Sequence, residues 1–257
     1  MTEGNSENEP LSNLSGNDGF TYTGRELEAM SVAANYHNWI LEIFKPHLGR
    51  HLVEVGAGLG SFSELILSRH DCESLSLVEP SREMFEQLRI RASQMPPTPR
   101  VDVYHASFAE AAPLISARQS PDSVIYVNVL EHIEDDENEL AAIHNALSAQ
   151  GRVFIFVPAL AWLYGAFDER VGHVRRYTKN DLEARLRRAG FEIIVSTYFD
   201  LIGVAPWWIK YRLLKSATMQ AEAVRFYDRY IVPSARRFES LIKPPIGKNL
   251  IVVAEKR

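Results

Sequence analysis

The 257-residue sequence contains a single cysteine, Cys72, which excludes an internal disulfide and a zinc cluster built on cysteines. It also lacks an excess of positive charge: 28 Lys and Arg stand against 33 Asp and Glu, a net charge of −5. This balance gives no general attraction to nucleic acid. The longest apolar run, near residues 201–209, contains a proline and is shorter than the roughly 20 residues that cross a bilayer.

The N-terminal residues lack the basic stretch followed by an apolar stretch that marks a secretory signal peptide. We therefore expect a cytoplasmic protein without an integral membrane segment. Residues 1–19 are rich in Asn, Ser, Glu and Gly, which predicts a disordered tail. The overall composition, 46 % apolar and 24 % charged, is that of an ordinary globular protein.

Short apolar runs alternate with amphipathic stretches along most of the chain. Such runs are typical of parallel strands that helices cover on both sides. A first helix is expected within residues 25–45. Strands are expected at residues 51–55, 74–78, 101–104, 123–128, 152–158, 191–199 and 249–254. The pattern predicts an α/β fold with a mainly parallel, doubly wound sheet.

Residues 200–247 interrupt this alternation and are rich in aromatic and basic side chains. Two interpretations stay open: a helical lobe packed on the sheet, or a lid over a binding cleft at the carboxyl end of the strands. We accordingly divide the chain into a domain of residues 20–199 and 248–257 and a helical insertion of residues 200–247. A homodimer through the insertion is favoured over contact of this segment with a membrane.

A glycine-rich turn, EVGAGLG at residues 54–60, leaves the first predicted strand and enters a predicted helix. Glycines at 56, 58 and 60 let the backbone turn sharply and approach a ligand closely. Glu79 ends the second strand, where a carboxylate can accept hydrogen bonds from both hydroxyls of a ribose. The turn and the acid together indicate a nucleoside-containing ligand.

Two residues distinguish between nucleoside ligands. A dinucleotide fingerprint requires glycine or alanine where this chain has Ser61. Glu54, two residues before the first glycine, would repel a pyrophosphate but attract an ammonium and a sulfonium. The turn therefore favours S-adenosylmethionine over NAD.

These motifs resemble those of the class I S-adenosylmethionine-dependent methyltransferases, within the small-molecule group that includes quinone-biosynthesis-like enzymes. EVGAGLG (54–60) is similar to their first motif, LVEPS (77–81) to the second, and NVLEHIEDD (128–136) to the segment after the fourth strand. The resemblance covers about residues 24–199 and the last strand. It implies a Rossmann-like sheet of seven strands whose last strand is antiparallel, with S-adenosylhomocysteine as the cofactor product.

The resemblance also implies roles for individual residues. It places the turn around the methionine part of the cofactor, one acid on the ribose, and backbone groups along the cofactor floor: Glu54, Gly56, Ala57, Gly58 and Gly60 in the turn, Glu79 with Pro80 beside the adenine, and Asn128 and Val129 below. Where the family has an acid for the adenine amino group, this chain has Ser107 followed by Phe108. The hydroxyl can accept that bond and the ring can pack on adenine. Tyr36 could reach the methionine carboxylate.

Two histidines could remove a proton from the methyl acceptor, since histidine titrates near neutral pH. His132 follows the fourth strand, although a histidine at a helix start, bonded to backbone, explains it equally simply. His173 is the second candidate. The acidic residues 134–137 are read as a solvated helix start, and no metal is expected.

The acceptor site is expected in the loop after the fifth strand and near the N-terminus, with contacts from Tyr22, Tyr164, Arg175, Arg176 and Tyr177. Arginine binds carboxylate or phosphate with two parallel hydrogen bonds, which favours an anionic acceptor. Alternatively, both arginines pair with Asp168 and Glu169 and hold the loop.

The sequence as a whole predicts methyl transfer from S-adenosylmethionine to an oxygen or nitrogen atom of a small, anionic or aromatic metabolite. Two other functions stay open: methylation of RNA or protein, and regulation by a non-catalytic protein that only binds S-adenosylmethionine. The absence of a strong basic stripe disfavours RNA.

Overall fold

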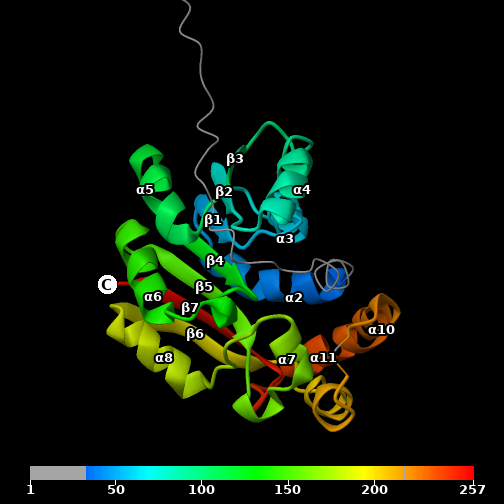
Figure 1. The fold of residues 1–257 in the computed structure, drawn as a ribbon. Helices are drawn as coiled ribbons and strands as arrows, with labels where there is room; N and C mark the ends of the chain where they lie inside the picture. Colours follow the sequence, from blue (N-terminus) through cyan, green and yellow to red (C-terminus); the bar gives the residue numbers. More distant parts are fainter. Residues whose placement is uncertain (1–32, 217) are drawn as a thin grey trace, which may run out of the picture.

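The computed structural model describes residues 33–216 and 218–257 (Figure 1). The predicted tail of residues 1–19, Tyr22 and the first part of the helix expected within residues 25–45 lie outside these residues. The described part of that helix is α2, Ala34–Phe44.

The centre of the molecule is one seven-stranded sheet with the order β3-β2-β1-β4-β5-β7-β6. Strands β1 to β5 pair in parallel, and β7 runs antiparallel to both β5 and β6. This confirms the expected fold class, including the antiparallel last strand. The strands are β1 His51–Val55, β2 Ser74–Val78, β3 Arg100–Tyr104, β4 Ser123–Val127, β5 Arg152–Pro158, β6 Phe191–Phe199 and β7 Asn249–Lys256.

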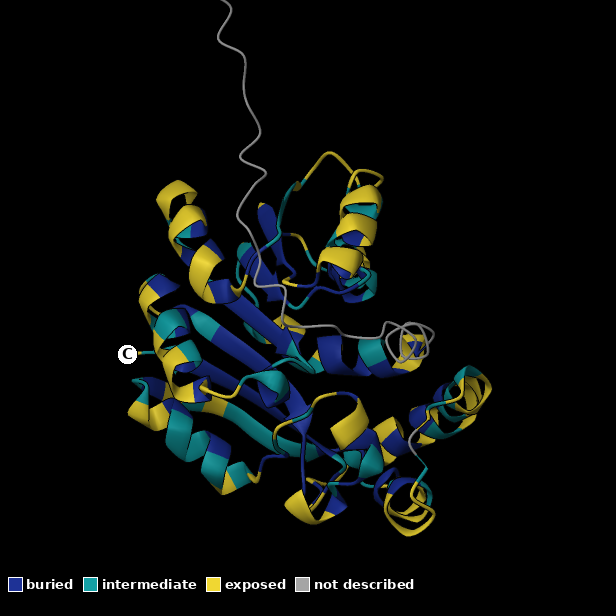
Figure 2. Ribbon diagram, viewed as in Figure 1, coloured by how far each residue is buried: buried dark blue, intermediate teal, exposed yellow. Residues whose placement is uncertain are grey.

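Helices cover both faces of the sheet, whose central strands are buried between them, whereas the edge strands β3 and β6 are only partly buried (Figures 1 and 2). Apolar side chains of one face pack with α5 Phe108–Arg118, α6 Asp136–Ala146 and α8 Lys179–Arg188. Those of the other face pack with α2, α3 Ser61–Arg69, α4 Arg82–Ala92 and α11 Val232–Glu239. Successive strand residues alternate between the two cores, since neighbouring side chains of a strand point to opposite faces.

Shorter helices precede β1, follow the carboxyl ends of β4 and β5, and form the insertion. They are η1 Lys45–His47 before β1, η2 Leu130–His132 after β4, η3 Ala161–Leu163 and α7 Ala166–Arg170 after β5, and α9 Val204–Trp207, η4 Trp208–Leu213, α10 Ala221–Phe226 and η5 Tyr227–Ile231 in the insertion. The loops after β4 and β5 therefore carry η2 and α7 to the same edge of the sheet as the glycine-rich turn after β1.

Two α-helices were not predicted from the sequence: the short helix α7, in the segment expected to be a loop, and the longer helix α5. Pro113 lies inside it and argues against a helix when the sequence is read alone. Ser107 begins the helix with a capping box, in which its hydroxyl accepts from the Glu110 N–H and the Glu110 carboxylate accepts from Ser107. Burial of Ala111 and Ile115 against the sheet then stabilises it despite the proline.

Residues 200–247 form a helical insertion between β6 and β7, and it packs against α2. The carboxylate of Asp228 accepts from the Asn35 and Tyr36 backbone N–H groups at 3.1 and 2.8 Å. Val232 and Ala235 join the core around α2. Asp228 thus satisfies the free N–H groups at the start of a helix almost 200 residues earlier in the chain.

Replacing Asp228 with alanine is expected to lower the free energy of unfolding by about 2 kcal/mol, because a buried N-terminal cap is lost. Chemical denaturation measures this change. Glu222→Ala is the matched control, since Glu222 is an exposed acid of the same insertion. Equal denaturation midpoints for the two variants would contradict the role given to Asp228.

Candidate active site

The glycine-rich turn wraps around the end of β2. The Gly56 and Ala57 N–H groups donate to the Val78 carbonyl at 2.8 and 3.2 Å. Gly56 has a φ of 66°, a conformation that favours glycine. A Cβ atom there would lie 2.5 Å from Cγ2 of Val129, so a side chain at residue 56 would also collide with the loop after β4.

Glu79 joins this turn to the segment after β2. One carboxylate oxygen accepts from the Gly58 N–H at 2.9 Å, and the other accepts from the Ser81 N–H at 2.8 Å. Burial raises the pKa of Glu79, and the two backbone donors act in the opposite direction. The carboxylate is therefore fixed in place at the carboxyl end of the second strand.

Glu54 lies on β1 with its carboxyl group buried in the wall of a cavity. One oxygen accepts from the Ser63 hydroxyl at 2.5 Å. Burial raises the pKa of Glu54 to about 8. Among the described residues, no basic side chain forms an ion pair with it. A buried acid without a cationic partner fits a ligand that supplies an ammonium group.

The cavity, of about 350 Å³, extends from this turn to the loops after β4 and β5. Gly56, Gly58 and Asn128 line one part of it. The other part is lined by two histidines, one arginine and aromatic side chains of the insertion: His132, His173, Arg176, Trp207, Tyr211 and Tyr227. The turn that resembles a cofactor site and the predicted proton acceptors thus share a single cavity.

Asp168 of α7 holds the His173 imidazole. The Asp168 carboxylate lies 2.7 Å from Nδ1 of His173 and 2.8 Å from Nε of Arg176. Burial opposes ionisation of Asp168, but the hydrogen bonds from His173 and Arg176 lower its pKa. The charged carboxylate favours the tautomer with the proton on Nδ1, which leaves Nε2 of His173 able to accept a proton.

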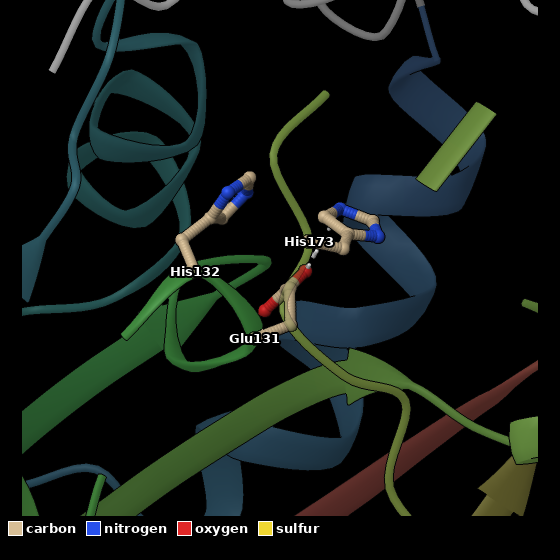
Figure 3. A group of neighbouring side chains, drawn as sticks. All are labelled: Glu131, His132 and His173. Atoms are coloured by element: carbon tan, nitrogen blue, oxygen red, sulfur yellow. Dashed lines mark ion pairs between the residues drawn. The ribbon is translucent and has the colours of Figure 1, made fainter. Parts of the chain in front are cut away.

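Glu131 and His132 lie beside this imidazole (Figure 3). An oxygen of Glu131 is 3.7 Å from Nε2 of His173, and the two histidine rings are 4.8 Å apart. Burial raises the pKa of Glu131 to about 8. Burial, reinforced by nearby His173, lowers the pKa of His132 to about 4. At neutral pH, Glu131 is therefore mainly protonated and His132 is uncharged.

The same three side chains offer one ligand atom each, all within 4.8 Å of one another, which is a spacing that could hold a metal ion. The expectation that the protein uses no metal stays a prediction. His132 also contacts the Gly172 carbonyl through Nδ1 at 3.2 Å, in keeping with the interpretation of a histidine bonded to backbone.

The raised pKa of Glu131 predicts a pH-dependent stability. Folding raises this pKa from 4.5 to about 8, so between these values the folded protein binds more protons than the unfolded chain. Its contribution to the free energy of unfolding therefore falls as the pH rises through this window. Glu131→Gln removes the titration and should flatten the dependence in urea denaturation at pH 5, 7 and 9. Glu134→Gln, at an exposed neighbour, should follow the wild type; parallel curves for both variants would refute the assignment.

The sequence profile of the methyltransferase domain family matches residues 22–196. The chain belongs to this family. The expected recognition is thereby confirmed at the level of the family, whereas the quinone-biosynthesis-like group stays a prediction. No curated protein sequence matches this methyltransferase significantly.

Solved structures of S-adenosylmethionine-dependent methyltransferases share the fold of this methyltransferase. Phosphoethanolamine N-methyltransferase 2 of Haemonchus contortus, in complex with S-adenosyl-L-methionine, superposes with a TM-score of 0.61 at 16 % identity, over 93 % of this chain and 58 % of its own. A methyltransferase of Archaeoglobus fulgidus gives 0.54 at 17 % identity, over 89 % and 94 %. The N-methyltransferase NodS of Bradyrhizobium japonicum, with S-adenosyl-l-homocysteine, gives 0.55 at 11 % identity, over 88 % and 87 %. These structures show the shared fold, and membership of the methyltransferase family implies S-adenosylmethionine as the cofactor.

The structure of the methyltransferase brings six of the twelve predicted cofactor residues into the cavity lining; Gly60, Glu79, Pro80 and Val129 lie outside that lining. Those that line the cavity are Tyr36, Glu54, Gly56, Ala57, Gly58 and Asn128. Gly60 begins α3, Glu79 and Pro80 follow β2, and Val129 packs on Gly56. The hydroxyl of Tyr36 is hydrogen-bonded to Asp200 and Asn249, at 3.1 and 3.0 Å.

Ser107 and Phe108 do not line the cavity. The Ser107 hydroxyl is engaged in the capping box of α5. The Phe108 ring is fully buried in the core, 6.2 Å from the ring of Tyr126. The predicted stacking of Phe108 on adenine is not supported, because its side chain belongs to the buried face of a helix that the sequence analysis missed.

Three of the predicted acceptor contacts also lie away from the cavity lining. Tyr177 is fully buried and donates to Asp136 at 2.7 Å, and Arg175 pairs with the same carboxylate at 2.6 Å. Tyr164 donates to the His173 carbonyl at 2.8 Å. Of the two arginines, only Arg176 lines the cavity. The alternative in which paired charges hold the loop therefore describes Arg175 and Arg176 better, with Asp136 in place of Glu169.

Two acids and one lysine of the site were not proposed from the sequence as site residues. Asp168 orients His173, as described above. Lys248, which lines the cavity, pairs with buried Asp200 at 2.9 Å and lies about 5 Å from the rings of Tyr36 and Trp207. Lys248 pairs with an acid 48 residues earlier in the chain, and Asp168 meets His173 and Arg176 across one loop, so no regular spacing marks these residues in the sequence.

Proposed function

We propose that this protein transfers the methyl group of S-adenosylmethionine to an oxygen or nitrogen atom of a small acceptor with an aromatic or apolar body. The observation that carries the proposal is the shared cavity, which joins the glycine-rich turn to the Asp168–His173 pair. A turn alone supports only binding of the cofactor. The oriented imidazole in the same cavity supports catalysis.

The residues near the glycine-rich turn and the Asp168–His173 pair then have separate roles. When bound, S-adenosylmethionine supplies an electrophilic methyl group with a good leaving group. Glu54, the backbone of Gly56 and Gly58, and Glu79 hold the cofactor, so that the protein supplies mainly alignment and exclusion of water. Nε2 of His173 takes the proton of an acceptor hydroxyl or ammonium, and Asp168 stabilises the resulting imidazolium.

The acceptor end of the cavity favours an aromatic body over an anionic one. Arg176 lies 5.0 Å from the ring centre of Trp207, but its charge is matched by Asp168. The charge of Lys248 is likewise matched by Asp200. Trp207, Tyr211 and Tyr227, all from the insertion, offer ring faces to an acceptor. The insertion thus covers the acceptor end of the cavity as a lid would.

Release of S-adenosylhomocysteine tests the proposal. The purified protein is incubated with S-adenosylmethionine and separate panels of phenols, aromatic amines, aliphatic polar acids, RNA and protein extract. Turnover of a phenol or aromatic amine supports the proposal. Turnover of RNA or protein alone would establish the alternative substrate class. Calorimetric binding of S-adenosylmethionine with no turnover in any panel would instead establish a non-catalytic binding protein.

A further inference from the structure

The insertion carries an unusual concentration of exposed apolar side chains. Eleven of the sixteen large apolar residues that are exposed in the described part of the chain lie between residues 202 and 246. This stretch holds less than a quarter of the described residues. Scattered exposed apolar residues are normal on protein surfaces, but such a concentration marks an interaction surface.

Apart from Leu241, the most exposed of these side chains lie on two helical segments. Leu213 and Leu214, at the end of η4, are 58 % and 70 % exposed. Phe226 and Tyr230 lie one turn apart where α10 continues into η5, with ring centres 5.1 Å apart. In the view of Figure 1 both segments lie to the right of the sheet, beyond one end of its strands. We call these four residues, together with the exposed basic residues Arg212, Lys215, Arg225 and Arg229, the insertion surface.

The charge on the insertion surface is opposite to that of the whole protein. Residues 200–247 contain eight Lys and Arg and four Asp and Glu, a net charge of +4, so the rest of the chain carries −9. Seven of the eight basic residues are exposed; among them are Arg212, Lys215, Arg225 and Arg229.

The acids of the insertion are turned inward, with one exception. Asp200 and Asp228 are buried, and the Glu239 carboxylate accepts from the Asp200 and Leu201 N–H groups. Glu222 is the exposed acid among the described residues of the insertion. The outward charge is therefore almost entirely positive, next to exposed leucine and aromatic side chains.

We propose that the insertion surface docks the protein on an anionic lipid bilayer. Helices that combine exposed Leu, Phe and Trp with Lys and Arg bind at the interface of a membrane, the apolar groups in the lipid and the basic groups at anionic headgroups. In the described part of the chain, no helix is long and apolar enough to cross a bilayer. The contact is therefore one of surface docking.

Two features favour lipid over other partners. Leu213 and Leu214 are aliphatic, and exposed aliphatic side chains contact acyl chains, whereas nucleic-acid surfaces use aromatic stacking and basic contacts. A second copy of the insertion surface would place like charges face to face, which opposes the homodimer expected from the sequence. Because Trp207 and Tyr211 of the same segment line the cavity, docking brings the cavity close to the lipid.

Vesicle co-sedimentation tests this docking independently of methyl transfer. The full chain is mixed with vesicles of phosphatidylcholine alone or of phosphatidylcholine and phosphatidylglycerol in equal amounts, at low and high salt. We expect binding to the anionic vesicles, little binding to the neutral ones, and weaker binding at high salt. Equal binding to both vesicles, or binding to neither, would overturn the proposal.

Two double variants locate the contact. Leu213→Ser with Leu214→Ser removes apolar groups, and Arg225→Gln with Arg229→Gln removes charge; each should weaken binding roughly tenfold or more. Arg89→Gln with Ile90→Ser, exposed residues on α4, is the matched control and should bind as the wild type. Circular dichroism verifies that all variants fold. The proposal is wrong if the insertion variants bind vesicles as well as the control variant does. It is also wrong if tRNA, added at the same total negative charge as the lipid, displaces the protein from the vesicles. A change from dimer to monomer in the leucine variant would show instead that the surface joins two copies of the protein.

Discussion

Replacing Glu79 with alanine is expected to weaken binding of S-adenosylmethionine about 100-fold or more. Hydrogen bonds to a charged group each contribute roughly 1.5–3 kcal/mol, and a carboxylate at this point can accept from both ribose hydroxyls. The substitution also removes the acceptor of the Gly58 and Ser81 N–H groups, which loosens the turn that holds the methionine part. Titration calorimetry with S-adenosylmethionine measures the loss.

Controls separate a binding effect from a folding effect. Glu79→Gln retains an oxygen that can accept one hydrogen bond, so its affinity should lie between those of the wild type and the alanine variant. Glu73→Ala removes an exposed acid just before β2 that pairs with Arg50, and its affinity should equal that of the wild type. An unchanged affinity in Glu79→Ala, with a normal melting curve, would remove Glu79 from the cofactor site.

Replacing His173 with alanine is expected to lower kcat about 100-fold to 10,000-fold with little change in the affinity for S-adenosylmethionine. Its imidazole is the group in the cavity with an ionised, buried carboxylate on Nδ1, which prepares Nε2 to accept a proton. The effect falls on kcat because proton removal belongs to the chemical step. The assay uses the acceptor with the highest turnover in the panels described above.

Asp168→Asn tests the orientation of the imidazole separately. An asparagine amide favours the wrong histidine tautomer, so kcat should fall and the pH profile should change, although the His173 side chain is intact. His132→Gln removes the other imidazole of the cavity and should have a smaller effect, since burial already lowers the pKa of His132 to about 4. His47→Ala, at a histidine of η1 that does not line the cavity, is the control and should keep the wild-type kcat. A normal kcat in His173→Ala would show that the acceptor needs no base or that another group removes the proton.

The strands and the glycine-rich turn could be predicted because their signals are local. The runs at residues 51–55, 74–78 and 152–158 match β1, β2 and β5 without a shift, since continuous apolar runs bounded by turns define buried strands. The turn at residues 54–60 is recognisable because its backbone conformation requires glycine: at Gly56, the positive φ and the nearby Val129 side chain leave no room for a Cβ atom. Helix α5 was missed because burial outweighs the penalty of Pro113, and burial cannot be read from a short window.

The sequence by itself determined the α/β fold, the cofactor class and the position of the ligand end of the sheet, because each depends on residues that are near neighbours in the chain. The tertiary structure alone decided which titratable groups act together. Asp168, His173 and Glu131 come from α7, the loop after it and η2, and folding places them within hydrogen-bonding or ion-pair distance. In the folded protein, Arg175 pairs with Asp136 and Arg176 lines the cavity, although the two arginines are adjacent in sequence. Charge pairing and burial depend on distances in space, and the linear order of residues does not contain them.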